Sequence, residues 1–273
     1  MTNHITQYNP ANGYTPLVTP GIGELEHLTF GMINLTPAQT LSFRPEHGHE
    51  AALTILTGSI DVADGNGQRW EGVGGRTSVF EGSADTFFVP PACRLELHAL
   101  TTCEIAVSQA RSDIDGPVTL FPAADALLEQ RGYPGWRREV RTYLRSSANV
   151  GRLILGEVAS ALGEWSSFPP HKHDIDNMPA EADLEELYFF KLDPPTGFAS
   201  QGLYSPDDPA NRNRAYVVRH HDIVTIPRGY HPVAVAPGHR IYYYWVLAGA
   251  GHILKVHVED SLRWLEPEFK IKD

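Results

Sequence analysis

Two histidines one residue apart, His171 and His173, lie in the segment Phe-Pro-Pro-His-Lys-His-Asp. In an extended chain, residues two apart project to the same side, with Cα atoms roughly 6 to 7 Å apart. Imidazoles at that separation can converge on one metal ion. Glu186 follows in the run Leu-Glu-Glu-Leu-Tyr-Phe-Phe, and His231 follows a Pro-x-Gly turn. Three histidines and one carboxylate leave coordination positions open for water or substrate, as a catalytic metal site requires.

The elements that must position these residues are predicted to be strands. Short β-branched or aromatic runs bounded by Gly, Pro, Asp or Asn recur along the chain, which is typical of an all-β fold. Helical signal is confined mainly to residues 123–132. The two halves run alike, since each has an H-x-H pair and an apolar strand that ends at proline. This weak internal repeat predicts two stacked barrels with a boundary near residue 130.

The complete pattern resembles the cupin superfamily, and its duplication resembles a bicupin, with two jelly-roll barrels in tandem. We expect a degenerate N-terminal barrel with a connector over residues 1–130 and a metal-binding C-terminal barrel over 131–273. The stretches "WSSFPPHKHD", "LEELYFF", "DPPTGF" and "PRGYHPV" are similar to the 5-deoxy-glucuronate isomerase family of inositol catabolism. The resemblance is strong over about residues 151–249 and weaker over the first half.

The resemblance implies one divalent ion per chain, held by His171, His173, Glu186 and His231. Glu185 is the alternative carboxylate, and Glu186 is favoured because it shares a strand face with a tyrosine two residues on. This ligand set suits zinc, manganese or ferrous iron, and the spacing does not discriminate between them.

The implied reaction is an aldose–ketose isomerisation of 5-deoxy-D-glucuronate to 5-dehydro-2-deoxy-D-gluconate. A divalent ion would stabilise the enediolate charge as a carbon-bound proton is removed. Asp174, Tyr188 and Tyr204 are candidates for the group that moves the proton. The sequence does not identify which of them acts, and a hydride shift that needs no base stays open.

A second requirement is a partner for the substrate carboxylate. The family pattern carries Gln-Arg after "DPPTGF", whereas this chain has Gln201-Gly202. Gln201, Arg219 and Arg228 are therefore the candidates for substrate binding, and a different substrate is the alternative. In the first half, His47 and His49 precede Glu50, but no P-x-G-x-H follows. We expect that half to be structural, with His49 and Glu50 as solvated residues at a strand start.

Two other classes of function use the same residues. One is a cupin dioxygenase or another sugar-acid isomerase, and the other is a non-catalytic protein that binds metal or a sugar acid. The formal net charge of −11 argues against binding to nucleic acid or anionic lipid. No signal peptide or apolar membrane span is evident, so a cytoplasmic enzyme with free cysteines is expected. The oligomeric state is not readable from the sequence, and a homodimer is one alternative.

Overall fold

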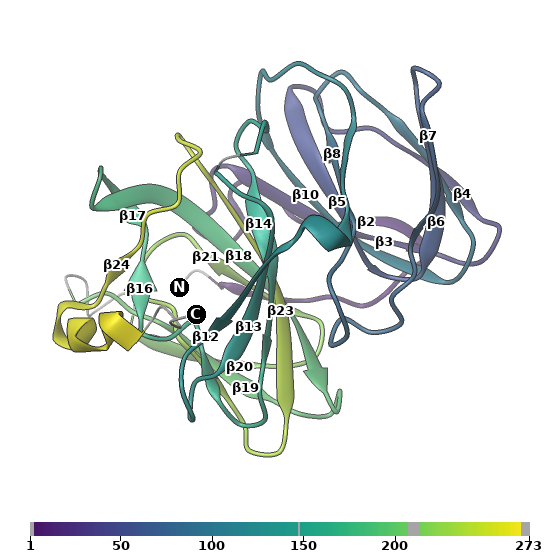
Figure 1. Ribbon diagram of the computed structural model, residues 1–273. Helices are drawn as coiled ribbons and strands as arrows, with labels where there is room; N and C mark the ends of the chain where they lie inside the picture. The colour runs from purple at the N-terminus through teal and green to yellow at the C-terminus, as the bar shows by residue number, and fades with distance from the viewer. Residues whose placement is uncertain (1–2, 147, 207–212, 269–273) are drawn as a thin grey trace.

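The computed structural model describes residues 3–146, 148–206 and 213–268. Strands dominate it, and the helices of these ranges are short 3-10 segments, η1 (Ile22–Glu24), η2 (Ala123–Asp125) and η3 (Asp260–Glu268). Two barrels lie side by side (Figure 1), so the expected all-β fold of tandem barrels is confirmed. In the described part of the chain, no helix is both long and apolar enough to cross a membrane.

Each barrel combines one large and one small antiparallel sheet. The large sheet of the N-terminal barrel has the order β11-β8-β5-β10-β3-β2. Its strands are β2 (Gly13–Val18), β3 (Leu28–Leu35), β5 (His49–Thr57), β8 (Thr86–Val89), β10 (Cys103–Arg111) and β11 (Thr119–Phe121). The small sheet has the order β4-β9-β6-β7. Its strands are β4 (Thr40–Phe43), β6 (Ser59–Asp64), β7 (Arg69–Gly74) and β9 (Leu95–Ala99).

The C-terminal barrel repeats this plan. Its large sheet has the order β1-β21-β18-β23-β14-β13-β12, with β17 also paired to β18. These strands are β1 (Ile5–Gln7), β12 (Leu127–Arg131), β13 (Arg138–Leu144), β14 (Ile154–Ser160), β17 (Asp174–Asn177), β18 (Glu181–Asp193), β21 (Asp222–Ile226) and β23 (Arg240–Gly249). The small sheet, β15-β22-β19-β20, contains β15 (Trp165–Ser166), β19 (Ala199–Leu203), β20 (Arg214–Val218) and β22 (Val233–Val235). A further pair joins β16 (His171–Lys172) to β24 (His257–Val258).

The strand orders correspond position by position. Strands β8, β5, β10, β3 and β2 of the first barrel occupy the places of β21, β18, β23, β14 and β13 in the second. The repeat expected from the sequence is thus visible in the topology. The N-terminal end of the chain departs from this division, because β1 pairs with β21 of the C-terminal barrel.

The segment between the barrels differs from the sequence expectation. The helical pattern over 123–132 yields only the short η2, and Leu127–Arg131 forms β12. This edge strand pairs with β13, while Leu127 and Leu128 are exposed rather than buried along one helical face. The helix prediction was wrong because pairing to the sheet outweighs a weak local propensity. Strand pairing changes from the first barrel to the second between Phe121 and Leu127.

Three hydrophobic clusters explain the long apolar runs. One fills the N-terminal barrel, one fills the C-terminal barrel, and the third contains residues of both barrels. On β18, Leu187 and Phe189 join the shared cluster, whereas Tyr188 and Phe190 point into the C-terminal barrel. The large sheets are therefore buried on both faces, which is why their strands read as continuous apolar runs instead of alternating ones.

Two buried glutamates tie the barrels together reciprocally. Glu50 on β5 accepts hydrogen bonds from three successive backbone N–H groups at residues 151–153, just before β14. Glu185 on β18 accepts from three N–H groups at residues 26–28, at the start of β3. The expectation that Glu50 and His49 are solvated is wrong, since both are buried. Each carboxylate holds the start of a strand of the other barrel, β14 for Glu50 and β3 for Glu185.

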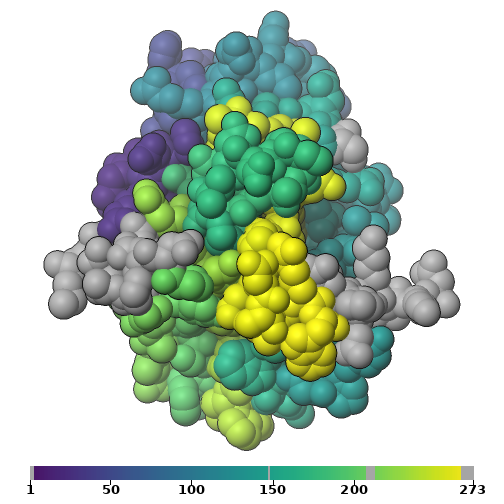
Figure 2. Space-filling model, turned by 90° about the vertical axis from the view of Figure 1, so that its left-hand side faces the viewer, coloured from purple at the N-terminus to yellow at the C-terminus, as the bar shows by residue number. Residues whose placement is uncertain are grey.

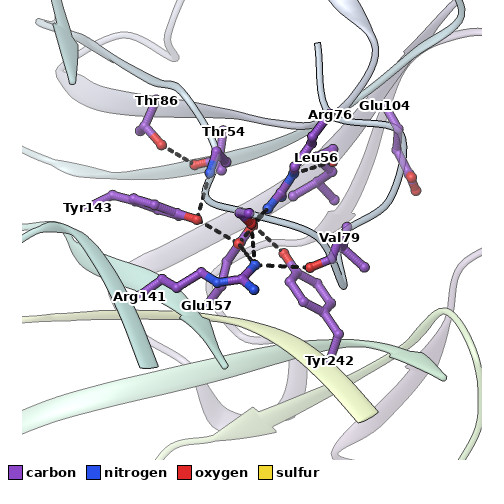
Figure 3. Close-up of polar contacts among 12 residues, drawn as sticks. Thr54, Leu56, Arg76, Val79, Thr86, Glu104, Arg141, Tyr143, Glu157 and Tyr242 are labelled. Carbon is purple, nitrogen blue, oxygen red and sulfur yellow. Dashed lines mark hydrogen bonds and ion pairs between the residues drawn. The ribbon is translucent and has the colours of Figure 1, made fainter. Parts of the chain in front are cut away.

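A third buried carboxylate, Glu157 on β14, anchors a network across the same interface (Figure 3). Arg76 of the N-terminal barrel binds both of its oxygens, at 2.5 and 2.8 Å. The hydroxyl groups of Tyr143 and Tyr242 donate to it at 2.6 Å each. Burial by itself raises the pKa of Glu157, but Arg76 and the two hydroxyl groups outweigh this effect and hold the pKa below the ordinary glutamate value.

Glu157→Gln is expected to lower the free energy of unfolding by about 3–5 kcal/mol, because it leaves the Arg76 charge buried without its partner. Urea unfolding at pH 7 measures this change. Glu71→Gln, at an exposed position of β7, is the matched control and should leave the free energy nearly unchanged.

The Glu157–Arg76 ion pair also predicts that the free energy of unfolding depends on pH. When folding depresses the pKa of a carboxyl group, the ionised group stabilises the folded state. This stabilisation is complete above the unfolded pKa of about 4.3 and is lost as the pH falls through the folded-state pKa. The stability difference between the wild type and Glu157→Gln should therefore narrow as the pH is lowered below about 4. An undiminished difference at pH 3 would contradict this account.

Candidate metal centre

Neighbouring elements of the C-terminal barrel bring the sequence-predicted ligands together. His171 lies in β16, His173 directly precedes β17, and Glu186 lies in the middle of β18. His231 follows β21 in the turn before β22. That turn needs Gly229, which has φ of +93° and whose missing Cβ would lie 2.7 Å from the carbonyl oxygen of Tyr204.

His173, Glu186 and His231 form one compact cluster. Their ligand atoms lie within 4.8 Å of one another, and Glu186 Oε2 is 3.2 Å from Nε2 of both histidines. All three side chains are buried. His171 lies beside the cluster, with its ring centroid 4.8 Å from that of His231. Among the described residues, no other such group of His, Cys, Asp or Glu is brought together.

The tautomers of the three histidines are set by the backbone. Nδ1 of His171, His173 and His231 lies 2.9, 2.8 and 2.9 Å from the carbonyl oxygens of Pro169, Leu184 and Gly229. A carbonyl oxygen only accepts, so each Nδ1 carries the proton and each Nε2 offers a lone pair. This arrangement, with the outer nitrogen bound to a carbonyl, is typical of metal-ligating histidines.

The chemistry of the cluster fits a divalent metal ion. His231 Nε2 is buried and makes no hydrogen bond, although it lies near the Glu186 carboxylate. A buried acceptor without a donor is costly unless something else binds it. Burial raises the pKa of Glu186, but the imidazole rings of His173 and His231 beside the carboxylate outweigh this and hold the pKa at about 2. The carboxylate is therefore ionised and available to a cation.

A cavity of about 400 Å³ opens onto the cluster. His171, His173, Glu186 and Tyr188 line it, together with aromatic and aliphatic side chains of β13, β14 and β23. The C-terminal segment that carries β24 contributes the wall residues 254–256. Figure 2 shows the yellow C-terminal segment lying over this side of the barrel. The cavity suits a small molecule bound next to a metal ion.

Of the three candidates for proton transfer, only Tyr188 lines this cavity. Its ring centroid is 5.9 Å from that of His231, and its hydroxyl group donates to Ser167 Oγ at 3.3 Å. Asp174 instead binds the Lys172 ammonium group and accepts from the N–H of Gly229. It thereby supports the turn that presents His231.

Tyr204 lies elsewhere, since its hydroxyl group donates to Glu259 and its ring stacks on Tyr230. Lys172, between the two histidines, points away from the cluster. It is buried and paired with Asp174 and Glu181.

The three candidates for carboxylate binding lie outside the cavity lining. Gln201 is fully buried, and its Nε2 donates to the carbonyl oxygen of His231 at 2.8 Å. Arg219 packs over the Phe198 ring at 5.5 Å, and Arg228 is exposed. Gln201 therefore holds the backbone of the His231 turn.

Sequence reasoning missed four cationic residues that line the cavity, Arg131, Arg138, Arg145 and Lys255. The alternation of Arg138 with the apolar residues of β13 was the available signal. The expected connector before β13 hides this signal in the sequence. Glu185, the alternative carboxylate, points to the other barrel, whereas Glu186 faces the histidines.

Comparison with known proteins shows which family has this sequence. The model of the KduI/IolB family matches residues 5–265. The chain belongs to that family. It is 36% identical to the 5-deoxy-glucuronate isomerase of Geobacillus kaustophilus over 249 residues, which cover 91% of this chain and 89% of the relative. It is 32% identical to the protein of the same name from Bacillus subtilis over 250 residues, 91% of each chain.

Solved structures agree with the fold. An IolB-like protein from Salmonella typhimurium LT2 has a TM-score of 0.91 at 28% identity, covering 97% of this chain and all of that one. The oxalate decarboxylase of Lactobacillus farciminis, at 12% identity, has a TM-score of 0.69 and covers 98% of this chain and 91% of its own. The expected family and bicupin fold are therefore confirmed.

If this cluster binds a divalent ion, metal binding should depend on the side chains of the cluster. His231→Ala and Glu186→Gln should each lower the metal affinity by about tenfold or more, measured as metal per chain after dialysis against a chelator. His49→Ala, from the histidine pair of the N-terminal barrel, is the matched control and should keep the wild-type metal content. Equal metal loss in all three variants would contradict the assignment.

Proposed function

We propose that this isomerase converts 5-deoxy-D-glucuronate into 5-dehydro-2-deoxy-D-gluconate, an aldose–ketose isomerisation, with one divalent ion per chain. The observation that carries the proposal is the His173–Glu186–His231 cluster, of which His173 and Glu186 line a cavity of about 400 Å³. The names of relatives that cover most of this chain support the substrate. His171, whose ring lies against that of His231, would complete the ligand set.

Hydrogen bonds within the protein hold the candidate metal ligands in fixed positions. The three backbone carbonyls fix the imidazole rings, and Gln201 and Asp174 fix the two sides of the His231 turn. A divalent ion bound there would polarise the substrate carbonyl and make the neighbouring carbon-bound proton more acidic. The apolar walls limit water around the reacting atoms, which strengthens these electrostatic effects.

Tyr188 is the proposed residue for proton movement. It is the one candidate from the sequence whose side chain lines the cavity, and Ser167 accepts its hydrogen bond. Ser167 itself adopts φ of +48°, a conformation that a residue other than glycine keeps only where surrounding contacts enforce it. The strained residue thus orients the hydroxyl group of Tyr188 relative to a bound sugar.

The reaction is tested by following the aldehyde proton of 5-deoxy-D-glucuronate by NMR in D₂O with metal-loaded protein. The aldehyde signal should disappear as the ketose forms, and chelation or His231→Ala should abolish this turnover. Deuterium in the product would indicate a proton transfer through an enediol, and its absence a hydride shift or a shielded proton. Metal-loaded protein without turnover would overturn the proposed substrate.

Tyr188→Phe removes the hydroxyl group and keeps the ring that packs against Tyr243 at 4.4 Å. We expect kcat to fall by about 10²–10⁴-fold, with KM little changed. Tyr204→Phe is the matched control and should remain within a few-fold of the wild type. A Tyr188→Phe variant with wild-type kcat would remove Tyr188 from the proposed mechanism.

A further inference from the structure

The proposed isomerisation moves two hydrogens of the substrate. An aldose becomes a 2-ketose when the hydrogen on C2 moves to C1 and the hydroxyl proton on O2 moves to O1. The first hydrogen can move through an enediol or as a hydride, but the overall change requires the second transfer in either case. A group that donates one proton while it accepts another is suited to this transfer between oxygens.

Tyr243 on β23 lines the cavity together with Tyr188 on β18. In the register of these two strands, Tyr188 pairs with Trp245 and Tyr243 pairs with Phe190. The two tyrosines are therefore diagonal neighbours on the same face of the sheet. Their ring centroids are 4.4 Å apart, and the ring planes are inclined by 32°. The cavity thus has two tyrosines packed side by side in its wall.

Two consecutive serines bind the hydroxyl groups of these tyrosines. Ser166 Oγ is 2.8 Å from the hydroxyl oxygen of Tyr243, and Ser167 Oγ accepts from Tyr188 at 3.3 Å. Side chains of consecutive residues in an extended strand point to opposite sides. The φ of +48° at Ser167 departs from the extended conformation, which allows both serines to reach the tyrosine pair. One segment of the chain therefore positions both hydroxyl groups.

Burial keeps both tyrosines protonated at neutral pH. It raises the pKa of Tyr243 to about 12 and the pKa of Tyr188 well above the ordinary tyrosine value. A neutral phenol has one proton to donate and lone pairs that accept. Either hydroxyl group can donate in the hydrogen bond between Ser166 and Tyr243. Ser166 can therefore supply that hydrogen, which leaves the Tyr243 proton available to a ligand.

Tyr243 and the metal cluster adjoin the same space. Glu186, Tyr188 and Tyr243 all line the cavity. The Tyr188 ring centroid is 4.4 Å from that of Tyr243 and 5.9 Å from that of His231. The Glu186 charge also adds to the effect of burial on the pKa of Tyr243, as expected for groups that face one small cavity. A sugar acid that contacts the cluster therefore lies near both tyrosines.

We propose that Tyr243 is a second catalytic residue, whose hydroxyl group passes the proton from O2 to O1 of the sugar acid. The Tyr243 O–H bond breaks as its proton binds O1, and the O2–H bond breaks as that proton binds the Tyr243 oxygen. Tyr243 ends as it began, and the protein gains no charge. Ser166 is a positioning residue that acts through Tyr243. This inference rests on the proposed function for the reaction, and it applies to the enediol and the hydride route alike.

The test measures turnover of 5-deoxy-D-glucuronate by metal-loaded variants. Tyr243→Phe keeps the ring and removes the hydroxyl group, so kcat should fall by about 10²–10⁴-fold with KM little changed. Ser166→Ala should lower kcat by about tenfold. Tyr244→Phe is the matched control, because Tyr244 lies on the same strand and its hydroxyl group also bonds a buried serine, Ser108 of the other barrel, at 2.9 Å. This control should keep the wild-type kcat.

Isotope effects distinguish a proton relay from a purely structural role of Tyr243. In Tyr243→Phe the transfer between oxygens becomes the slow step, so the ratio of kcat in H₂O to kcat in D₂O should rise above that of the wild type. Deuterium at C2 of the substrate should then have little effect on kcat. A variant that only disturbs packing would keep the isotope effects of the wild type. The metal content per chain and the calorimetric affinity for D-gluconate, an open-chain sugar acid without an aldehyde, should stay at wild-type values.

Turnover separates this inference from the proposed function. A wild type that isomerises 5-deoxy-D-glucuronate, with a Tyr243→Phe variant that keeps its kcat, would overturn the inference and leave the function standing. Equal loss in Tyr244→Phe, unchanged isotope effects, or loss of metal or of D-gluconate affinity would also overturn it. If Tyr243→Phe folds poorly, Ser166→Ala with wild-type kcat would do the same. A metal-loaded wild type without turnover would overturn the function and the inference together.

Discussion

The fold depends on burying both faces of the two large sheets. One face of each sheet fills its own barrel, and the other packs against the partner sheet in the shared cluster. A polar group on these strands has little access to water, so each must find a partner within the protein. Glu50, Glu157 and Glu185 satisfy this requirement with backbone N–H groups or an arginine of the other barrel. The buried carboxylates therefore fix the register of one barrel on the other.

This constraint also positions the candidate metal ligands His173, Glu186 and His231. Glu185 and Glu186 are neighbours on β18 and point to opposite faces of the sheet. Glu185 holds the strand entry of the N-terminal barrel, and Glu186 meets the histidines of the C-terminal barrel. Because the first contact fixes the strand, the second carboxylate is held in place without relying on a flexible loop. Such support by packed strands is what a preorganised site requires.

The sequence predicts features that depend on local spacing and misses those that depend on pairing between strands. The cluster of His173, Glu186 and His231 follows from the two-residue period of strands and from the Pro-x-Gly turn before His231. Both features can be recognised in the sequence alone. The buried state of Lys172 depends on Glu181, which reaches it only after β17 folds back on β18. The placement of Arg131 and Arg138 in the cavity lining depends on the pairing of β12 with β13. The local sequence pattern of β12 indicates a helix instead.

The repeat explains why one barrel carries the cluster and the other does not. Ala51 on β5 pairs with Val89, as Glu186 on β18 pairs with Ile226. Ala51 thus stands where Glu186 stands in the second barrel, and Glu50 has the role of Glu185. The proline after Val89 is followed by no Gly-x-His turn. The N-terminal barrel retains the glutamate that joins the barrels, and among its described residues no cluster like that of the second barrel forms around the histidine pair.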